Sequence, residues 1–212
     1  MKLALYGAAG MIGSRIASEA LGRGHSVSAL VRTTGKLAIK DPKLTETQAD
    51  VANAGQVESL VRGHDAVVCA ISPRNDRGPQ LMAYAILSLA KGLPKAEVKR
   101  LVVVGGAGSL MVAPGKRLMD TPLFPEAYKV EAKAGAEALA LLRLQDQLDW
   151  TYISPPGVIQ PGERTGKFRV GGERLLTDAS GQSKISAEDY AMALVDELEQ
   201  GKHLKQRITV AY

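Results

Sequence analysis

Cysteine is nearly absent from this chain of 212 residues, since Cys69 is its single example. A lone cysteine cannot form an internal disulfide, so we expect a protein of a reducing compartment, the cytoplasm. Cys69 lies in the apolar run 66–71, which favours a packing role over that of a reactive thiol. Because this cysteine and the three histidines lack ligand spacing, the sequence predicts no metal site.

Long apolar runs and aromatic residues are also scarce. No window of about eighteen apolar residues occurs, so we expect neither a membrane span nor a signal peptide. One Trp, six Tyr and two Phe are present to stack on bases, and the 27 Lys and Arg residues form no long basic run. A multiply anionic cofactor explains the net charge of +5 as well as nucleic acid would, and nucleic acid is not an expected partner.

Glycine, in contrast, recurs at regular intervals near the N-terminus. The apolar run 1–6 leads into a G-x-x-G-x-x-G pattern that opens an apparent helix at 11–22. A strand, a glycine turn and a helix N-terminus bind the diphosphate of a dinucleotide, because backbone N–H groups can approach the anion. The first glycine makes the turn, the second removes a side chain and the third lets the helix pack closely. The predicted cofactor-binding residues are Gly7, Ala8, Ala9, Gly10, Met11, Ile12 and Gly13.

The end of the second expected strand, 26–31, predicts which dinucleotide binds. Arg32 follows this strand directly, and no Asp or Glu occurs between Glu19 and Asp41. An acidic residue at this junction binds a ribose 2′-hydroxyl, whereas an arginine accommodates a 2′-phosphate. The sequence therefore favours NADP(H) over NAD(H); the alternative is that Arg32 belongs to a solvated basic loop.

Strand-like and helix-like segments alternate along the chain. This alternation predicts a Rossmann-type, doubly wound and mainly parallel α/β sheet with helices on both faces, in a single domain covering 1–212. The stretch 155–185 is too short for a second domain and is expected to form a substrate-side elaboration. The expected strands are 1–6, 26–31, 44–48, 65–71, 101–104, 150–154 and 207–212, with strand-like stretches at 167–170 and 174–177, and the expected helices are 11–22, 54–62, 80–91, 124–147 and 187–199.

Ligands of such sheets bind beyond the carboxyl ends of the strands. Asp50 and Val51 follow the third strand, where an adenine pocket is often found, although Asp50 is equally suited to cap the next helix. Glycines after the fifth strand either let the backbone approach a nicotinamide ring or form a purely structural turn. The cofactor-binding residues predicted at this edge are Asp50, Val51, Ala70, Ile71, Ser72, Gly105, Gly106, Pro155 and Pro156.

Several motifs of the chain occur together in one known family. They are the residues 7–13, 31–32, 50–51, 104–109, 128–132, 154–157, 161–166 and 185–191. On these residues the chain resembles the atypical short-chain dehydrogenases/reductases of the NAD(P)H-binding, NmrA-like group. Within that group it is similar to small proteins called NADH-flavin reductases or biliverdin/flavin reductase-like proteins. The glycine motif is shared by a broad superfamily, whereas the late segments are more specific.

Two departures from this family bear on catalysis. The wider superfamily has a catalytic Tyr and Lys in Y-x-x-x-K, but Tyr128 is followed by Ala132 at the lysine position. Lys133 lies about 140° around the helix from Tyr128 and cannot substitute directly. Flavin and biliverdin reductase relatives have a His after the Pro-Pro pair, where this chain has Gly157. Tyr128 and Ser109 are the predicted catalytic residues, and the alternatives for Tyr128 are a cofactor contact or a helix start.

The resemblance and the cofactor motif together predict an NADPH-dependent oxidoreductase. A planar conjugated acceptor such as a flavin or quinone takes hydride without an acid/base dyad, so it suits this site, with flavin as a substrate. The alternatives are a non-catalytic NADP(H)-sensing regulator of the NmrA-like type and a sugar-nucleotide epimerase-like isomerase, for which 212 residues leave little room. We expect a monomer or a homodimer, since apolar residues in 134–144 suit either a dimer contact or internal packing. The residues expected to face the acceptor are Ser72, Pro73, Arg74, Ser109, Tyr128, Pro155 and Pro156.

Overall fold

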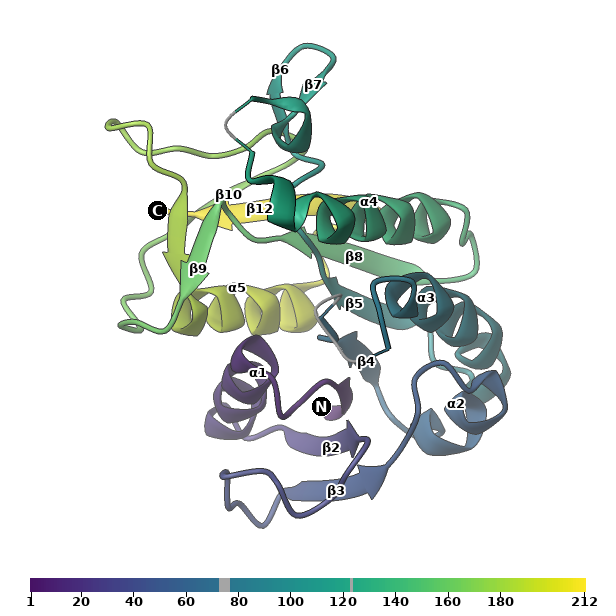
Figure 1. Ribbon diagram of the computed structural model, residues 1–212. Helices are drawn as coiled ribbons and strands as arrows, with labels where there is room; N and C mark the ends of the chain where they lie inside the picture. Colours follow the sequence, from purple (N-terminus) through teal and green to yellow (C-terminus); the bar gives the residue numbers. More distant parts are fainter. Residues whose placement is uncertain (73–76, 123) are drawn as a thin grey trace.

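The centre of the molecule is an eight-stranded sheet in the order β10-β12-β8-β5-β4-β1-β2-β3 (Figure 1). The structure is a computed structural model and describes residues 1–72, 77–122 and 124–212. Neighbouring strands of the sheet are parallel, except that β10 is antiparallel to β12. The strands of this sheet are β1 (Lys2–Tyr6), β2 (Ser26–Val31), β3 (Leu44–Gln48), β4 (Ala66–Cys69), β5 (Arg100–Val104), β8 (Asp149–Ser154), β10 (Arg169–Gly171) and β12 (Gln206–Ala211).

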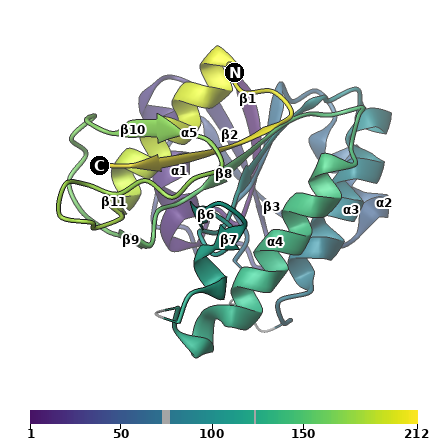
Figure 2. The same cartoon turned by 90° about the horizontal axis from the view of Figure 1, so that it is seen from above.

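Helices cover both faces of the sheet, as Figure 2 shows from above. Helices α1 and α5 pack against each other on one face, while α2, α3 and α4 lie on the other. The α-helices are α1 (Met11–Gly22), α2 (Ala54–Val61), α3 (Leu81–Gly92), α4 (Lys129–Arg143) and α5 (Ala187–Gln200), and the 3₁₀-helices are η1 (Pro94–Ala96), η2 (Leu118–Asp120) and η3 (Glu126–Tyr128). The doubly wound, mainly parallel sheet expected from the sequence is thereby confirmed.

Alternation along the strands divides the interior into two cores. On β1, Leu3 and Leu5 belong to the cluster under α1 and α5, whereas Ala4 and Tyr6 belong to the cluster under α2, α3 and α4. Successive side chains of a strand point to opposite faces, so a strand covered on both faces is apolar throughout. This arrangement explains why the strands read as continuous apolar runs in the sequence.

Two expected elements differ from the structure. The helix expected at 124–147 is wrong at both ends: the chain first forms η3, and α4 then covers only Lys129–Arg143. The helix ends early because the following turn brings Leu148, which is 1% exposed, into the core. The stretch 174–177 is not a strand, because it makes only a short bridge in which the Met111 N–H donates to the Glu173 carbonyl and the Leu175 N–H to the Met111 carbonyl.

Short pairings outside the main sheet were not expected from the sequence. Strands β6 (Met111–Ala113) and β7 (Lys116–Arg117) form a hairpin, and β9 (Val158–Gln160) pairs with β11 (Lys184–Ser186). The pairing of β9 with β11 closes the long connection between β8 and α5. The α5 N-terminus is capped as predicted, since the Ser186 hydroxyl accepts a hydrogen bond from the Asp189 N–H at 3.0 Å.

The apolar residues of 134–144 mostly face inward. Ala138, Leu139 and Leu142 are buried in the core where α4 packs on α3. Internal packing therefore accounts for them, whereas Leu144 at the helix end is 73% exposed. Within the described part of the chain, no helix combines the length and the apolar character needed to cross a membrane.

Candidate functional site

The glycine turn between β1 and α1 is built from close backbone contacts. Gly7 has a φ of +88°, and a Cβ atom there would lie 2.4 Å from the Ala70 carbonyl oxygen. A Cβ atom on Gly13 would lie 2.0 Å from the Gly7 carbonyl oxygen. Gly13 therefore lets α1 pack on the turn itself, and not simply on the sheet. The Gly10 N–H donates to the Gly7 carbonyl at 3.0 Å, which places Gly10 at the N-terminus of α1.

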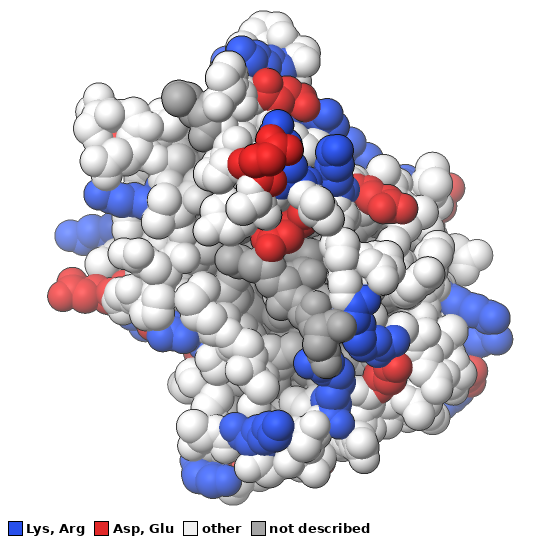
Figure 3. Space-filling view, viewed as in Figure 1, with Lys and Arg blue, Asp and Glu red and all other residues white. Residues whose placement is uncertain are grey.

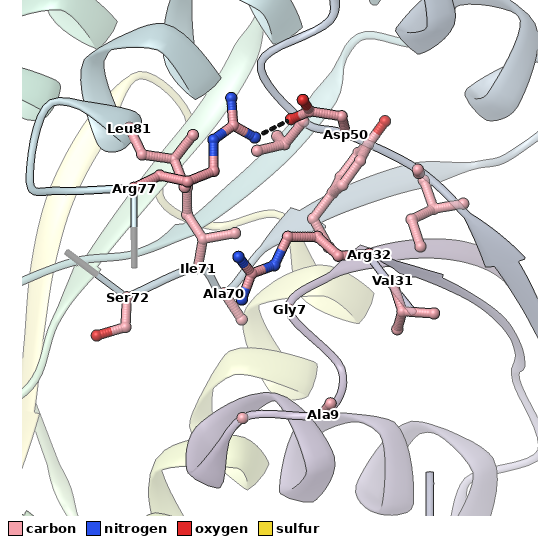
Figure 4. Close-up of a pocket in the computed structure, with 15 residues that line it drawn as sticks. Gly7, Ala9, Val31, Arg32, Asp50, Ala70, Ile71, Ser72, Arg77 and Leu81 are labelled. Carbon is pink, nitrogen blue, oxygen red and sulfur yellow. Dashed lines mark hydrogen bonds and ion pairs between the residues drawn. The ribbon is translucent and has the colours of Figure 1, made fainter. Parts of the chain in front are cut away.

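A cavity of about 500 Å³ opens beside this turn at the carboxyl edge of the sheet (Figure 4). It extends from the turn across the ends of β1, β2, β3 and β4 to the start of α3. Nine residues predicted to bind the cofactor line it together: Gly7, Ala9, Gly10, Arg32, Asp50, Val51, Ala70, Ile71 and Ser72. Parallel strands bring their carboxyl ends to one edge, which explains why residues distant in the sequence meet here.

Charged side chains line one end of the cavity. Arg77 Nη1 donates to Asp50 Oδ1 at 2.6 Å, as the dashed line in Figure 4 marks. Burial pushes the pKa of Asp50 upward, but the hydrogen bonds from Arg77 and from the Ala52 N–H, with the charges of Arg77 and Arg32, hold it below its ordinary value. Asp50 is therefore an ionised carboxylate with two arginines close to it.

The alternative role of Asp50 as a helix cap is wrong. The cap of α2 is Asn53, whose side chain accepts a hydrogen bond from the Gly55 N–H at 3.1 Å. Asp50 lies before this cap and instead accepts from the Ala52 N–H at 3.0 Å. Its carboxylate is thus held at the cavity wall by a local turn and by Arg77.

Several lining residues were not predicted from the sequence. They are Tyr6, Leu30, Val31, Ala49, Arg77 and Leu81. Tyr6, Val31 and Ala49 lie where β1, β2 and β3 end or just beyond, so the rule that ligands bind at carboxyl ends would have identified them. Arg77 and Leu81 had no comparable signal, because they do not directly follow a strand and only the tertiary structure places them at the cavity.

The remaining residues of the predicted glycine motif do not line the cavity. Ala8 is fully buried, and Gly13 packs on Gly7. Met11 is 42% exposed and Ile12 packs partly against the core under α1. The first-turn N–H groups of α1 still have no partner within the helix, as at any helix N-terminus.

The glycines after β5 are held by Tyr152 of β8. A Cβ atom on Gly105 would lie 2.1 Å from the Tyr152 ring, and the Gly106 N–H donates to the Tyr152 hydroxyl at 3.1 Å. The same hydroxyl donates to the Gly135 carbonyl at 2.9 Å, and burial raises its pKa to about 12. Gly105 is thus required by internal packing, whereas a Cβ atom on Gly106 would meet open space. Neither glycine lines the cavity.

Ser109, Pro155 and Pro156 come after the carboxyl ends of β5 and β8 but do not line the cavity. Arg207 of β12 donates from Nη1 to the Ser109 hydroxyl at 2.8 Å and forms an ion pair with Glu173. The Arg207 side chain is 2% exposed and that of Glu173 is 49% exposed, so Ser109 belongs to a partly buried polar network centred on a buried guanidinium. Pro155 and Pro156 are buried directly after β8.

Tyr128 ends η3 and immediately precedes α4, with its side chain 48% exposed. Its alternative role at a helix start therefore agrees with its position. Lys133 is exposed on α4, while Ala132 packs beside Gly108, whose added Cβ would lie 2.4 Å from the Ala132 Cβ. Pro73 and Arg74, also predicted to face the acceptor, lie outside the described residues.

Basic residues do not gather into one field on the face shown in Figure 3. Among the described residues visible there, acidic side chains lie between the basic ones. This distribution agrees with a local anion site at the cavity, where Arg32 and Arg77 lie, more than with an extended basic surface.

Comparison with known proteins relates the whole chain to one family. The sequence model of a family described as NAD(P)H-binding matches residues 7–201. A solved structure of a putative exported protein from Burkholderia pseudomallei is 48% identical, with a TM-score of 0.91 and full coverage of both chains. A putative epimerase from Bacteroides thetaiotaomicron is 41% identical, with a TM-score of 0.91, covering 100% of this chain and 96% of that one. A putative NADH-flavin reductase from Streptococcus pneumoniae is 38% identical, with a TM-score of 0.89, covering 100% and 99%.

Proposed function

We propose that this chain, which belongs to the NAD(P)H-binding family, is an NADPH-dependent reductase that transfers hydride to a planar conjugated acceptor such as a flavin or quinone. One observation carries the proposal. The glycine turn and two arginines line a single cavity, so it offers groups for both the diphosphate and the phosphorylated ribose of one dinucleotide. The similarity to an NADH-flavin reductase supports the acceptor class.

The cofactor lies, in this proposal, across the carboxyl edge of the sheet. Backbone N–H groups at the start of α1 bind the diphosphate, and Arg32 binds the 2′-phosphate. The ionised Asp50 is paired with Arg77 and lies close to Arg32, so it does not repel an anion as an unpaired carboxylate would. The nicotinamide extends past Ser72 toward Gly106, where the structure leaves space beside the backbone.

Hydride transfer to such an acceptor requires few catalytic groups from the protein. A flavin or quinone spreads the incoming electron pair over its conjugated system, so the protein need only hold the donor carbon and the acceptor in contact. The product proton comes from solvent or from the exposed Tyr128 hydroxyl. Ser72 and Tyr128 are the proposed acceptor-side residues, and Ser109 and the buried prolines after β8 are proposed to hold that side of the site in position. We also propose that the protein is located in the cytoplasm. The basis for this proposal is the lone cysteine, which suits a reducing compartment.

The test follows NADPH and then NADH at 340 nm with FMN, riboflavin, a short-chain quinone and biliverdin. We expect oxidation that depends on the acceptor and favours NADPH. Arg32→Ala should lower the NADPH preference about tenfold or more, since a charge-assisted phosphate contact is lost. Arg62→Ala is the matched control, because Arg62 pairs with Glu58 on the exposed surface of the opposite edge and should leave the preference unchanged. Absence of oxidation with every acceptor would overturn the reductase proposal.

A regulator is the second candidate, and the absence of a Y-x-x-x-K dyad favours it. Tight NADPH binding without turnover is the outcome that would support it. An epimerase is also suggested by the similarity to a protein of that description. Ala132 packs against the 105–109 loop where the dyad lysine would stand, which argues against an epimerase that needs this dyad.

A further inference from the structure

Three tyrosines are among the largest fully buried side chains of the described protein, and they differ in one respect. Tyr152 donates to the Gly135 carbonyl, and Tyr190 donates to the Ile153 carbonyl at 2.6 Å. The Tyr6 hydroxyl, in contrast, has no hydrogen-bond partner anywhere in the described residues, although its side chain is only 2% exposed. Buried polar groups are almost always paired, so this exception needs an explanation.

The position of Tyr6 explains why its hydroxyl is unpaired, because Tyr6 is the one tyrosine of these three that lines the cavity. It is the last residue of β1 and lies in register between Leu30 of β2 and Cys69 of β4. Its backbone is fully used in the sheet, since its carbonyl accepts from the Ala70 N–H at 2.9 Å. Only the hydroxyl is left for a ligand.

We propose that the Tyr6 hydroxyl donates a hydrogen bond to the adenine ring of the bound dinucleotide and is a specificity-determining group of the site. The inference rests on the proposed function only for the class of cofactor, and it does not depend on the acceptor. It assigns a role to a residue that neither the glycine motif nor the arginines explain.

Adenine is the part of the cofactor that fits this place. The glycine turn is suited to the diphosphate and Arg32 to the 2′-phosphate, whereas the wall around Tyr6 is apolar and suits a flat base. This wall includes Leu30, Val51 and Leu81. The ring nitrogens of adenine accept hydrogen bonds, and a phenol can donate one.

The hydroxyl is present as a donor over the whole physiological range. Burial, together with nearby Cys69 and Asp50, raises the pKa of Tyr6 well above its ordinary value. Because the hydroxyl is enclosed, a base reaches it only after a neighbouring side chain moves. We assign this movement to the Asp50–Arg77 ion pair, whose side chains are 43% and 38% exposed and line the same cavity.

The experiment measures binding by calorimetry with two fragments of the cofactor, 2′,5′-ADP and reduced nicotinamide mononucleotide. We expect Tyr6→Phe to weaken 2′,5′-ADP binding about five- to tenfold, the effect of one hydrogen bond, and to leave the mononucleotide affinity unchanged. Tyr84→Phe is the control for binding, because Tyr84 is 54% exposed on α3 and outside the cavity.

Thermal unfolding of the ligand-free variants separates this role from a structural one. Tyr6→Phe should keep or raise the Tm, since it removes an unpaired buried hydroxyl, whereas Tyr152→Phe should lower it by removing two hydrogen bonds. Equal 2′,5′-ADP affinity of Tyr6→Phe and the unaltered protein would overturn the inference. So would a Tm loss in Tyr6→Phe like that in Tyr152→Phe.

The outcomes for the two proposals can be told apart. If the unaltered protein binds 2′,5′-ADP but oxidises NADPH with no acceptor, the reductase proposal fails, and the Tyr6→Phe comparison still decides the inference. If it binds no adenine-containing fragment at all, both fail. If Tyr6→Phe binds normally and turnover with NADPH is observed, only the inference fails.

Discussion

The two halves of the central sheet differ in how their buried polar groups are hydrogen-bonded. In the first half, from β1 to α3, strand ends surround an open cavity and the Tyr6 hydroxyl has no partner among the described residues. In the second half, from β5 to β12, most buried polar side chains bond to one another or to the backbone. Three buried atoms there also lack a partner among the described residues, namely the Ser154 hydroxyl and the Nε atoms of Arg100 and Arg207, but none of these residues lines the cavity.

The proposed ligand site therefore lies in the first half, and the second half supports it. The first half has an open cavity beside an unpaired hydroxyl, whereas the largely bonded network of the second half holds the chain in one arrangement. The residues of the second half expected to face the acceptor, Ser109 and the prolines after β8, belong to the supporting network and the core. Ser109 and the two prolines should therefore affect catalysis by positioning the acceptor-side loop and not by touching the acceptor. The following predictions test this division.

The largest effect is expected at the glycine turn of the first half. Gly13→Ala should lower the free energy of unfolding by about 3 kcal/mol, the upper end for overpacking, because its Cβ would overlap the Gly7 carbonyl. It should also abolish NADPH binding. Urea denaturation and calorimetry measure the two effects. Gly22→Ala, in the same helix with open space around it, should leave both unchanged or slightly raise stability.

The second effect lies in the supporting network. Arg207→Met removes a buried guanidinium that bonds Ser109 and Glu173, and should cost about 2 kcal/mol of stability. If the network positions the acceptor-side loop, kcat should fall while the affinity for 2′,5′-ADP stays the same. Arg143→Met removes only the exposed partner of Glu173 and should change stability by less than about 1 kcal/mol. A fall in 2′,5′-ADP affinity in Arg207→Met would contradict the division into two halves.

A third effect depends on pH and concerns Glu197 of α5, in the second half of the molecule. Burial raises the pKa of the Glu197 carboxyl, but hydrogen bonds from His203 and the charge of Arg100 lower it by more, so its pKa is below the ordinary value. This contribution to stability is therefore fully present above the unfolded-state pKa of about 4.3 and is lost as the pH falls through the folded-state pKa.

Glu197→Gln should remove this contribution, which we expect to be about 1 to 2 kcal/mol near neutral pH. Urea denaturation between pH 3 and pH 7 measures it, with a flatter acid slope in the variant. Glu126→Gln is the control, since that side chain is 83% exposed. An unchanged acid slope in Glu197→Gln would show that the network does not depend on this ionisation.

The smallest effect is at the link between the halves. Arg164 makes two hydrogen bonds of 2.8 Å to Glu19 of α1, joining the connection after β9 to the first half. Because the arginine is 52% exposed, Arg164→Ala should cost less than about 1 kcal/mol, and the loss should shrink at high salt. A salt-independent loss would point to packing in place of charge.

Much of the fold could be predicted because its signals are local. Apolar runs, the glycine turn and the Ser186 cap each act through neighbouring residues, and the structure confirms the elements that they predicted. The hairpin of β6 with β7 and the pairing of β9 with β11 could not be predicted in this way. These strands are only two or three residues long and depend on distant partners.

The candidate site was predictable where strand ends define it and not where side chains meet across it. Asp50 follows β3 and Arg32 follows β2, whereas Arg77 is placed at the cavity by the tertiary structure, in which its guanidinium contacts Asp50. Gly105 has a packing requirement that its position in a glycine-rich loop did not reveal, because the Tyr152 ring that fills the space comes from another strand.

The sequence by itself determined the strand and helix order, the turn at Gly7 and the place of the cavity at the carboxyl edge of the sheet, because these follow from side-chain pattern and backbone freedom within a few residues. Only the tertiary structure decided that the Tyr6 hydroxyl lacks a partner, that Arg77 pairs with Asp50 and that Ser109 is bound by Arg207. The physical reason is that hydrogen bonding and burial depend on which atoms lie within a few ångströms. In a sheet of this strand order, those atoms come from segments far apart in the chain.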